Sequence, residues 1–440
     1  MRFTGEASQK AYAKINLTLN ITAKRPDGYH ELESVMQSVS LCDDVEVTCA
    51  FEIAGGTNRG ATHSLERVAL RGVGRAAACG LEQGAAHEKS NCEEIIRIFV
   101  DMEDDYIATQ DIPTDNRNTA YKAAIEYFNQ YSLRRNFGGI EPVDNLVPQK
   151  IAIRIKKRIP AAAGLAGGSA DGAAVLRALN EIVRRVYCDR TCYAASESVR
   201  CAQCDRMRCA ARENVRCSQC DRTRSATREN MPRYSSAPTP PPLSPDELRA
   251  AALRVGADVP FCLSGGTALA AGIGERLTSL PPMIAKYEVV LVNPLAEIST
   301  ARLFADFSLP DVSEINRLSK LNGFMIRSHG GAMDRCFNVL EAAALSRWRQ
   351  VKEIKSGLLK AGAVCAAMSG SGPTVFGLFE GDAMPGNAMR DGTASGGATD
   401  GGAMYGDAAS SVAAFTDAAR TASRMMSESG YWVRICSPVN

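Results

Sequence analysis

The chain has 440 residues, of which 45% are hydrophobic and 23% are charged, and its formal net charge is +2. This length predicts about two domains with enough apolar residues for ordinary cores. No run of about 18 apolar residues occurs, which excludes a membrane-spanning helix. The first residues lack the apolar stretch of a secretory signal peptide, so we expect a cytoplasmic protein without a membrane partner. A net charge near zero is not typical of nucleic-acid-binding proteins, and no nucleic-acid partner is expected.

The first predicted strand alternates between apolar and polar side chains. Its apolar face consists of Ile15, Leu17, Leu19 and Ile21. Its polar face consists of Lys14, Asn16, Thr18 and Asn20. A lysine on such a face is usually solvated, but a neighbouring lysine and asparagine can also stabilise charge and position a hydroxyl in phosphoryl transfer.

A turn over residues 25–32 follows and carries Tyr29 and His30 after an Asp-Gly pair. An aromatic ring beside an imidazole can sandwich and hydrogen-bond a nucleobase. A hairpin turn with a partly buried tyrosine explains the same residues, and the turn alone favours that interpretation.

Three segments interrupt the periodic sequence and are expected to be surface insertions, near residues 55–90, 185–245 and 381–407. The second contains a 16-residue repeat, Cys201–Arg216 followed by Cys217–Pro232. Seven of the 15 cysteines lie between Cys188 and Cys220. Their CxxC spacing is typical of zinc sites, but duplication of the unit explains the spacing without a ligand, so we favour an Arg/Cys-rich insertion over structural zinc.

The strongest local signal is PAAAGLAGGSADGAA, residues 160–174, between a predicted strand with buried Ile151, Ile153 and Ile155 and a predicted helix with Ser169 as its N-cap. Its glycines let the backbone approach a ligand, and the helix directs free N–H groups toward it. These features favour a phosphate site, and close packing of a turn is the alternative. No GK[ST] follows, so this is not a Walker A loop.

A second glycine-rich loop, residues 368–374, lies about 200 residues further on, before the predicted strand TVFGLFE. Two such loops can close on one ligand, although either alone is explained by a tight turn. In GADVPF, residues 256–261, the carboxylate of Asp258 lies among apolar neighbours. A carboxylate there can deprotonate an alcohol, whereas a turn-forming aspartate is the simpler interpretation of the short stretch alone.

Together these motifs resemble the GHMP kinases. The resemblance is carried by AYAKINLTLNITAKRPDGYHEL, IPAAAGLAGGSADGAA, GADVPF, VNPLAEISTARLF, CFNVLE and MSGSGPTVFGLF, which occur in the family's order and cover roughly 300 residues. It implies an α/β + α+β fold of two domains: an N-terminal α/β domain with the phosphate loop, residues 1–280, and a ferredoxin-like C-terminal domain, residues 281–440. The chain departs from many relatives in carrying Ser169-Ala170 where they have two serines.

The resemblance also implies the activity and its residues. It is greatest to the branch that transfers phosphate from ATP, with Mg²⁺, to the 2-hydroxyl of a cytidine-diphosphate-linked methylerythritol in isoprenoid precursor synthesis. Asp258 would be the general base, Lys14 would stabilise the acceptor oxygen and Asn16 would bind substrate. The cytosine would be held by Tyr29, His30 and Phe304. The nucleotide would be bound by Lys157, Pro160, Ala161, Ala162, Ala163, Gly164, Leu165, Ala166, Gly167, Gly168, Ser169 and Ala170.

Two alternatives stay open. The chain can be a kinase of the same family for another alcohol, such as mevalonate or homoserine, although the Gly-Tyr-His turn would then have no nucleobase to bind. The Arg/Cys repeat can be a zinc or RNA-binding module, since residues 185–233 around it carry a local charge of +5, but they hold few aromatic residues for base stacking. The motifs assign no magnesium ligand, and we expect a monomer or a weak homodimer.

Overall fold

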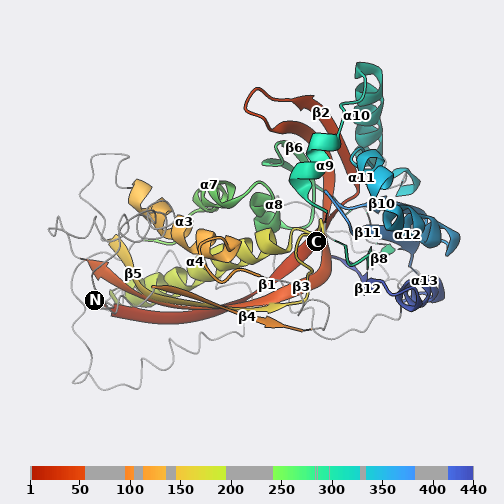
Figure 1. Ribbon diagram of the computed structural model, residues 1–440. Coiled ribbons are helices and arrows are strands. Elements are labelled where there is room, and N and C mark those ends of the chain that lie inside the picture. The colour runs from red at the N-terminus through yellow and green to blue at the C-terminus, as the bar shows by residue number, and fades with distance from the viewer. Residues whose placement is uncertain are drawn as a thin grey trace, which may run out of the picture. The chain divides into compact units, whose positions relative to one another are not determined.

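A computed structural model describes residues 2–54, 95–103, 112–134, 145–194, 241–282, 284, 286–296, 298–327, 333–381 and 415–439 (Figure 1). The chain divides into two compact units that alternate along the sequence. Unit 1 comprises residues 1–11, 43–158 and 168–263, and unit 2 comprises residues 12–42, 159–167 and 264–440. The sequential boundary near residue 280 stays a prediction. The segments expected as insertions lie outside the described residues, except for 185–194, 241–245 and Gly381.

Unit 1 is an α/β layer. Its strands come from β1 (Arg2–Asn16), β3 (His30–Ala54), β4 (Ile96–Met102) and β5 (Asn145–Lys157). Its helices are α3 (Thr119–Arg134), α4 (Gly167–Ala194), α7 (Pro245–Val255) and α8 (Val259–Ser264). β5 pairs antiparallel with β3 and parallel with β4, and α3 and α4 cover one face of these strands (Figure 1). The predicted alternation in β5 is confirmed, because Ile151, Ile153 and Ile155 all enter the core.

Helix α4 is longer than the sequence pattern predicts. It begins at Gly167, so the prediction of Ser169 as N-cap is wrong, and Ser169 lies inside the first turn. It continues to Ala194, into the segment expected as an insertion. At the start of that segment, the guanidinium of Arg185 donates to the carbonyl of Glu6 on β1 (3.0 Å) and pairs with Glu181 one helical turn earlier.

Unit 2 contains two groups of strands. One group joins the first part of β3 with β2 (Thr18–Lys24), β6 (Thr267–Gly272), β7 (Arg276–Leu280), β9 (Phe337–Asn338) and β13 (Pro438–Val439). The other group is an antiparallel sheet in the order β10 (Cys365–Met368), β11 (Val375–Glu380), β8 (Tyr287–Asn293) and β12 (Trp432–Cys436). The helices are α9 (Thr300–Asp306), α10 (Val312–Arg327), α11 (Glu341–Arg347), α12 (Arg349–Lys360) and α13 (Asp417–Glu428).

The second sheet has the ferredoxin-like arrangement. Taken in chain order, β8, β10, β11 and β12 are joined through helices before β10 and before β12, which is a β-α-β-β-α-β path. Helix α12 packs on β10 and β11, and α13 packs on β8 and β12. The predicted strands YEVVLVN and VFGLFE are β8 and β11, both almost wholly buried. The expected mixed α/β and α+β fold class is confirmed.

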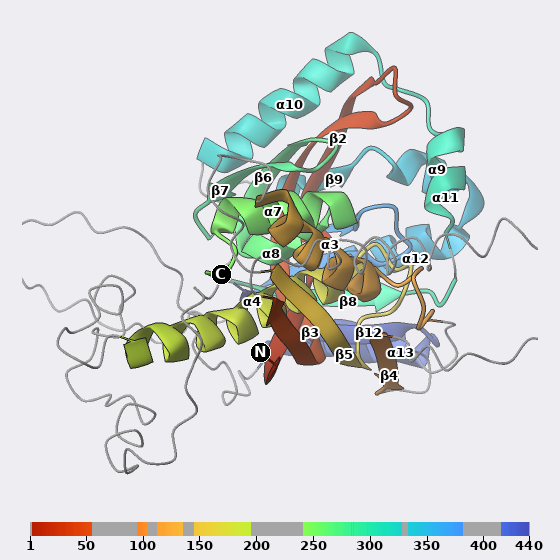
Figure 2. The ribbon, with the colours of Figure 1, turned by 90° about the vertical axis from the view of Figure 1, so that its left-hand side faces the viewer.

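The predicted first strand is interrupted at Leu17. β1 ends at Asn16 and β2 begins at Thr18, because the chain changes pairing partner there: the carbonyl of Leu17 accepts a hydrogen bond from Phe337 N (3.3 Å). The polar face is buried as well as the apolar one. Helix α10 runs alongside β2 (Figure 2), and Asn20 donates to Ser319 Oγ on that helix (3.2 Å).

Across the described ranges, no helix combines the length and the apolar character needed to cross a membrane.

Candidate active site

The phosphate loop between β5 and α4 has a backbone of alternating handedness. Ala162, Gly164 and Ala166 have positive φ angles of 50°, 75° and 57°, and the residues between them do not. Alternating left- and right-handed residues turn successive N–H groups into one concave nest that attracts anions. Two of the three are alanines, which adopt this conformation only at an energetic cost. This geometry supports a phosphate site rather than a turn made only for packing.

The carbonyl groups of the phosphate loop are bound by β1 and by the second glycine-rich loop. The carbonyl oxygens of residues 163–165 accept hydrogen bonds from Thr374 N (3.3 Å), Ser369 Oγ (2.9 Å) and Lys14 N (3.1 Å), in that order. Carbonyl oxygens carry partial negative charge and would repel a phosphate. Turning them into the protein therefore favours the anion-binding face of the loop.

The two glycine-rich loops are in contact within unit 2. A Cβ atom on Gly164 would lie 2.1 Å from the carbonyl oxygen of Ser369 and 2.9 Å from the nitrogen of Gly372. Both neighbours are backbone atoms, so no side-chain rotation can relieve the overlap. The two loops therefore contact each other directly at residues 163–165, and their closure on one ligand stays a prediction.

Lys14 and Asn16 form a buried polar pair. Lys14 Nζ donates to Asn16 Oδ1 (2.7 Å), and Asn16 Nδ2 donates to Ser34 Oγ (2.8 Å). Lys14 is only 4% exposed and Asn16 only 1%. The interpretation of Lys14 as a solvated strand lysine is therefore wrong. A buried ammonium beside an oriented amide is suited to binding an oxygen that develops negative charge.

His30 and Phe304 are stacked. Their ring centroids are 4.9 Å apart with an interplanar angle of 29°, and Phe307 contacts the imidazole by its edge. Burial lowers the pKa of His30, and the charge of Lys24 lowers it further, so the imidazole is neutral near pH 7. Tyr29 is 61% exposed at the tip of the turn, which contradicts the alternative of a partly buried tyrosine.

Lys157 lies in a buried cluster with two carboxylates in unit 1. Its Nζ contacts Asp43 Oδ2 (2.5 Å) and Asp171 Oδ2 (2.8 Å), and the nitrogen of Arg158 donates to Asp43 Oδ1 (2.5 Å). Burial raises the pKa of Asp171 to about 8, with Lys157 opposing the rise and the charge of Asp43 adding to it. The role of Lys157 near the nucleotide stays a prediction. The sequence reasoning missed Asp43 and Asp171, although Asp171 follows Ser169 by only two residues.

Asp258 directly precedes α8 in unit 1. Its carbonyl accepts a hydrogen bond from Cys262 N (3.1 Å), so its backbone occupies the helix N-cap position, and the residue is half-buried. Gly168, Ser169 and Ala170 also belong to unit 1. Lys14, Asn16, Tyr29, His30, Phe304 and the loop residues Pro160 to Gly167 belong to unit 2.

Two further observations concern ligands. No group of three or more His, Cys, Asp or Glu side chains gathers to hold a metal ion in the part of the chain that the structure describes. The repeat with its CxxC pairs lies outside that part, so the preference for an insertion over zinc stays a prediction.

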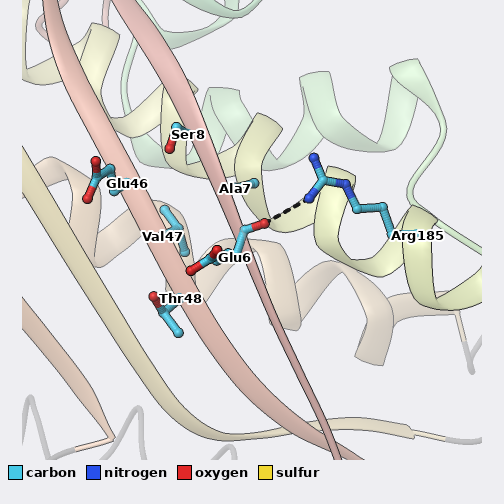
Figure 3. A pocket seen from close by; sticks show the side chains of 7 residues that line it. All are labelled: Glu6, Ala7, Ser8, Glu46, Val47, Thr48 and Arg185. Atoms are coloured by element: carbon cyan, nitrogen blue, oxygen red, sulfur yellow. Dashed lines mark hydrogen bonds between the residues drawn. The ribbon is translucent and has the colours of Figure 1, made fainter. Parts of the chain in front are cut away.

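An open pocket in unit 1 does not belong to the candidate site (Figure 3). It is lined by Glu6, Ala7, Ser8, Glu46, Val47, Thr48 and Arg185. None of these is a predicted site residue. Figure 3 shows the hydrogen bond from the guanidinium of Arg185 to the carbonyl of Glu6, two of the residues that line the pocket.

Comparison with known proteins identifies the family. Residues 118–202 match the family model of the GHMP kinases N terminal domain, and residues 310–390 match that of the GHMP kinases C terminal. The chain is 30% identical over 378 residues to 4-diphosphocytidyl-2-C-methyl-D-erythritol kinase of Acetivibrio thermocellus, covering 85% of this chain and 90% of that protein. It is 27% identical over 377 residues to the protein of the same name from Clostridium acetobutylicum, with coverages of 84% and 90%.

Solved structures share the fold. A crystal structure of 4-(cytidine 5'-diphospho)-2C-methyl-D-erythritol kinase superposes with a TM-score of 0.50 at 22% identity, covering 98% of this chain and 99% of that one. Homoserine kinase from Cytophaga hutchinsonii superposes with a TM-score of 0.51 at 14% identity, with coverages of 99% and 95%. From the curated relative at 30% identity, together with both family models, the chain belongs to the GHMP kinases, in the family of the 4-diphosphocytidyl-2-C-methyl-D-erythritol kinases.

Proposed function

We propose that this kinase transfers the γ-phosphoryl group of ATP to the 2-hydroxyl of 4-diphosphocytidyl-2-C-methyl-D-erythritol, in the synthesis of isoprenoid precursors. The observation that carries the proposal is the 30% identity to a curated enzyme of that name over 90% of its length. The nest in the phosphate loop and the aromatic pair His30–Phe304 supply chemistry suited to the two ends of this reaction.

The phosphate loop would bind the phosphates of ATP. Its alternating backbone directs N–H groups into one concavity, and α4 begins directly after it with its positive dipole end toward the loop. The binding residues would be the loop and first-turn residues 160–170, through their main chain. We include Lys157 as a residue near the nucleotide on the family resemblance alone.

Mg²⁺ is proposed as the second cofactor. When bound, it would neutralise charge on the β- and γ-phosphates as the phosphoryl group leaves. Magnesium usually keeps several waters and takes one or two carboxylates together with substrate phosphates. Because Asp43 and Asp171 are already engaged by Lys157, we name no magnesium ligand among them.

Three residues are proposed for the acceptor. Asp258 would take the proton of the 2-hydroxyl, since a carboxylate within hydrogen-bond reach acts as a general base. Lys14 would stabilise the negative charge that develops on the oxygen, and Asn16 would bind the substrate beside it. Their 2.7 Å hydrogen bond fixes the orientation of the ammonium group before substrate arrives.

The cytosine end would be recognised by His30, Tyr29 and Phe304. A neutral imidazole has one donor and one acceptor nitrogen, as a cytosine edge requires, and the lowered pKa of His30 keeps it in that form. Phe304 stacks on His30, and this aromatic pair supports the proposal of a base-binding surface here. Tyr29 is exposed beside them and is available to cover the base.

A coupled assay with purified protein, ATP, Mg²⁺ and the cytidyl substrate tests the activity. Asp258→Asn is expected to lower kcat by about 10²–10⁴-fold, as for loss of a positioned base. Asp246→Asn is the matched control, because it makes the same charge change on the exposed side of α7. Absence of turnover by the unmodified protein would refute the activity, and undiminished turnover by Asp258→Asn would refute the assigned base.

The alternative acceptors are separated by a second measurement. Tyr29→Ala and His30→Ala are expected to raise KM for the cytidyl substrate and to leave KM for ATP unchanged. Mevalonate and homoserine, tested in the same assay, are expected to give no turnover. If either is the better substrate, the family assignment stands and the proposed acceptor does not.

A further inference from the structure

The second glycine-rich loop, residues 368–374, is held at its beginning by two buried polar side chains of the CFNVLE motif. Asn338 Nδ2 donates to the carbonyl oxygens of Met368 and Gly370, both at 2.8 Å. Glu341 Oε1 accepts a hydrogen bond from Met368 N (2.7 Å). Asn338 is 5% exposed and Glu341 is 8% exposed, so water does not compete strongly for these bonds.

Both side chains are themselves fixed. Asn338 lies on β9, whose backbone pairs with β2 at Leu19, and its Oδ1 accepts from Leu340 N (2.9 Å). Glu341 begins α11, and its Oε2 binds Lys355 Nζ (2.5 Å) on α12. Asn338 therefore fixes the loop relative to β9, and Glu341 fixes it relative to α11. Neither contact serves the continuity of a sheet or a helix.

The far end of the same loop has a similar support. Asn293, the last residue of β8, donates from Nδ2 to Thr374 Oγ1 (2.9 Å), and both residues are fully buried. The loop thus has a buried amide at each end. Ser369 at the first support and Thr374 at the second are the residues that bond the phosphate loop.

The contacts continue from this loop to the phosphate loop. Ser369 Oγ donates to Gly164 O (2.9 Å) and Thr374 N donates to Ala163 O (3.3 Å). The Cα atom of Gly164 approaches the second loop so closely that no side chain fits between them. A shift of residues 368–370 is therefore expected to move the phosphate loop as well, because the two loops are packed without a gap between them.

We propose that Asn338 and Glu341 are positioning residues for nucleotide binding, which act by holding the loop 368–374 against the phosphate loop. The inference rests on the proposed function only in taking the nest as the ATP phosphate site. It gives the CFNVLE motif a task that its sequence alone does not reveal. Neither residue is expected to touch the substrate.

The test measures binding of MgATP to the full chain by calorimetric titration without any acceptor. Asn338→Asp keeps the size of the side chain and the acceptor for Leu340 N, but it replaces both loop-directed N–H donors by a carboxylate oxygen. We expect at least a ten-fold loss of MgATP affinity, since small displacements of binding groups are costly. Asn322→Ala is the control: this asparagine on α10 is similarly buried, and neither of its side-chain polar atoms has a hydrogen-bond partner among the residues that the structure describes.

Glu341 is tested by comparing two substitutions. Glu341→Gln keeps an oxygen that can accept from Met368 N and loses only the ion pair with Lys355, whereas Glu341→Ala loses both. MgATP affinity is expected to fall in the order wild type, Gln, Ala, and Lys355→Met is expected to match Gln. Thermal unfolding of every variant shows whether the substitution destabilises the fold. Affinities are compared only between variants that unfold at similar temperatures, so that a difference in affinity reports the position of the loop.

The outcomes are distinct. Unchanged MgATP affinity in Asn338→Asp, or an equal loss in Asn322→Ala, would overturn the positioning role. Equal affinity in Glu341→Gln and Glu341→Ala would overturn the part assigned to Glu341. Because no acceptor is present, failure of the proposed acceptor appears only as absent turnover in the coupled assay and leaves these binding results interpretable.

Discussion

At the scale of single residues, the phosphate loop depends on Gly164 for two reasons. Its φ of 75° is one that other residues adopt with strain, and backbone atoms of the second loop occupy the space where a Cβ would lie. Conformation and contact are separable at Gly430, which has a φ of 82°, while no atom of the described residues lies within 4 Å of the position that a Cβ would take there.

Gly164→Ala is therefore expected to reduce kcat/KM for ATP by on the order of 10²-fold, since the loops must move apart. Gly430→Ala carries the conformational strain alone and is expected to keep full activity with a small loss of stability. Steady-state kinetics at varied ATP, with unfolding curves for both variants, measures the difference. Equal kinetics in the two variants would show that the loop contact has no part in nucleotide binding.

The raised pKa of Asp171 makes the free energy of unfolding depend on pH. Burial raises its pKa to about 8 in the folded chain, against about 4 when unfolded. Between these values the folded state binds the proton more tightly than the unfolded state does. The free energy of unfolding is therefore expected to fall as pH rises from about 4 to about 8 through this group.

Asp171→Asn removes that titration while keeping the size of the side chain and an acceptor for Lys157. Its free energy of unfolding is expected to depend less steeply on pH within this window than that of the wild type. Urea unfolding at pH 5, 6.5 and 8 measures both slopes, with Asp246→Asn as the exposed control. Parallel slopes for wild type and Asp171→Asn would contradict a raised pKa at Asp171.

At the scale of elements, helix α7 is defined at its start by local chemistry. Ser244 Oγ accepts from Glu247 N (3.3 Å), and Glu247 Oε2 accepts from Ser244 N (2.8 Å), with Pro245 at the first helical position. This reciprocal capping box can be read from the sequence SPDE. It places the helix that leads to Asp258.

Ser244→Ala is expected to lower the free energy of unfolding by about 1 kcal/mol, because the N–H of Glu247 loses its acceptor. Ser244→Thr keeps the hydroxyl and is expected to stay close to wild type. Denaturant unfolding of the two variants provides the measurement. If Ser244→Thr lost as much free energy of unfolding as Ser244→Ala, the shape of the side chain rather than its capping hydrogen bond would determine the stability at this position.

The strands show where periodicity succeeds and where it does not. Alternation in 151–155 predicted β5 correctly, because one face of that strand meets a core and the other is more exposed. The same alternation at 14–21 predicted one continuous strand, and it did not decide whether the polar face is solvated or part of a site. Helix α10 contacts that face at Asn20, and Phe337 N bonds the carbonyl of Leu17, where the strand is divided. Both partners lie about 300 residues further along the chain.

At the scale of the whole molecule, the last part of the second expected insertion, residues 241–245, is bound to the helices of unit 1. Leu243 N donates to Asn180 Oδ1 (2.7 Å), and Asn180 Nδ2 returns a bond to Leu243 O (3.1 Å). Tyr131 OH donates to Pro241 O (2.8 Å). These bonds tie residues 241 and 243 to α3 and α4, so this end of the expected insertion packs on the folded chain.

Replacing residues 195–240 by a short Gly/Ser linker is therefore expected to preserve kcat within about two-fold and to leave thermal unfolding nearly unchanged, since surface loops tolerate length changes at small entropic cost. Metal analysis of the full chain and the shortened chain is expected to find no stoichiometric zinc in either. Zinc present in the full chain and lost on shortening would instead assign the CxxC pairs to a metal site.

By itself, the sequence determined the family and the mixed fold class and located the glycine-rich loop between β5 and α4, because these depend on motifs and local periodicity. Only the tertiary structure decided that Lys14 is buried on Asn16, that Lys157 lies between Asp43 and Asp171, and that Asn338 and Glu341 hold the second loop. The physical reason is distance along the chain: each of the last two arrangements joins residues from separate elements, and no local pattern encodes a hydrogen bond to a partner that folding brings near. The burial of Lys14 could not be predicted for a related reason, because the exposure of a strand face depends on the elements that pack against it.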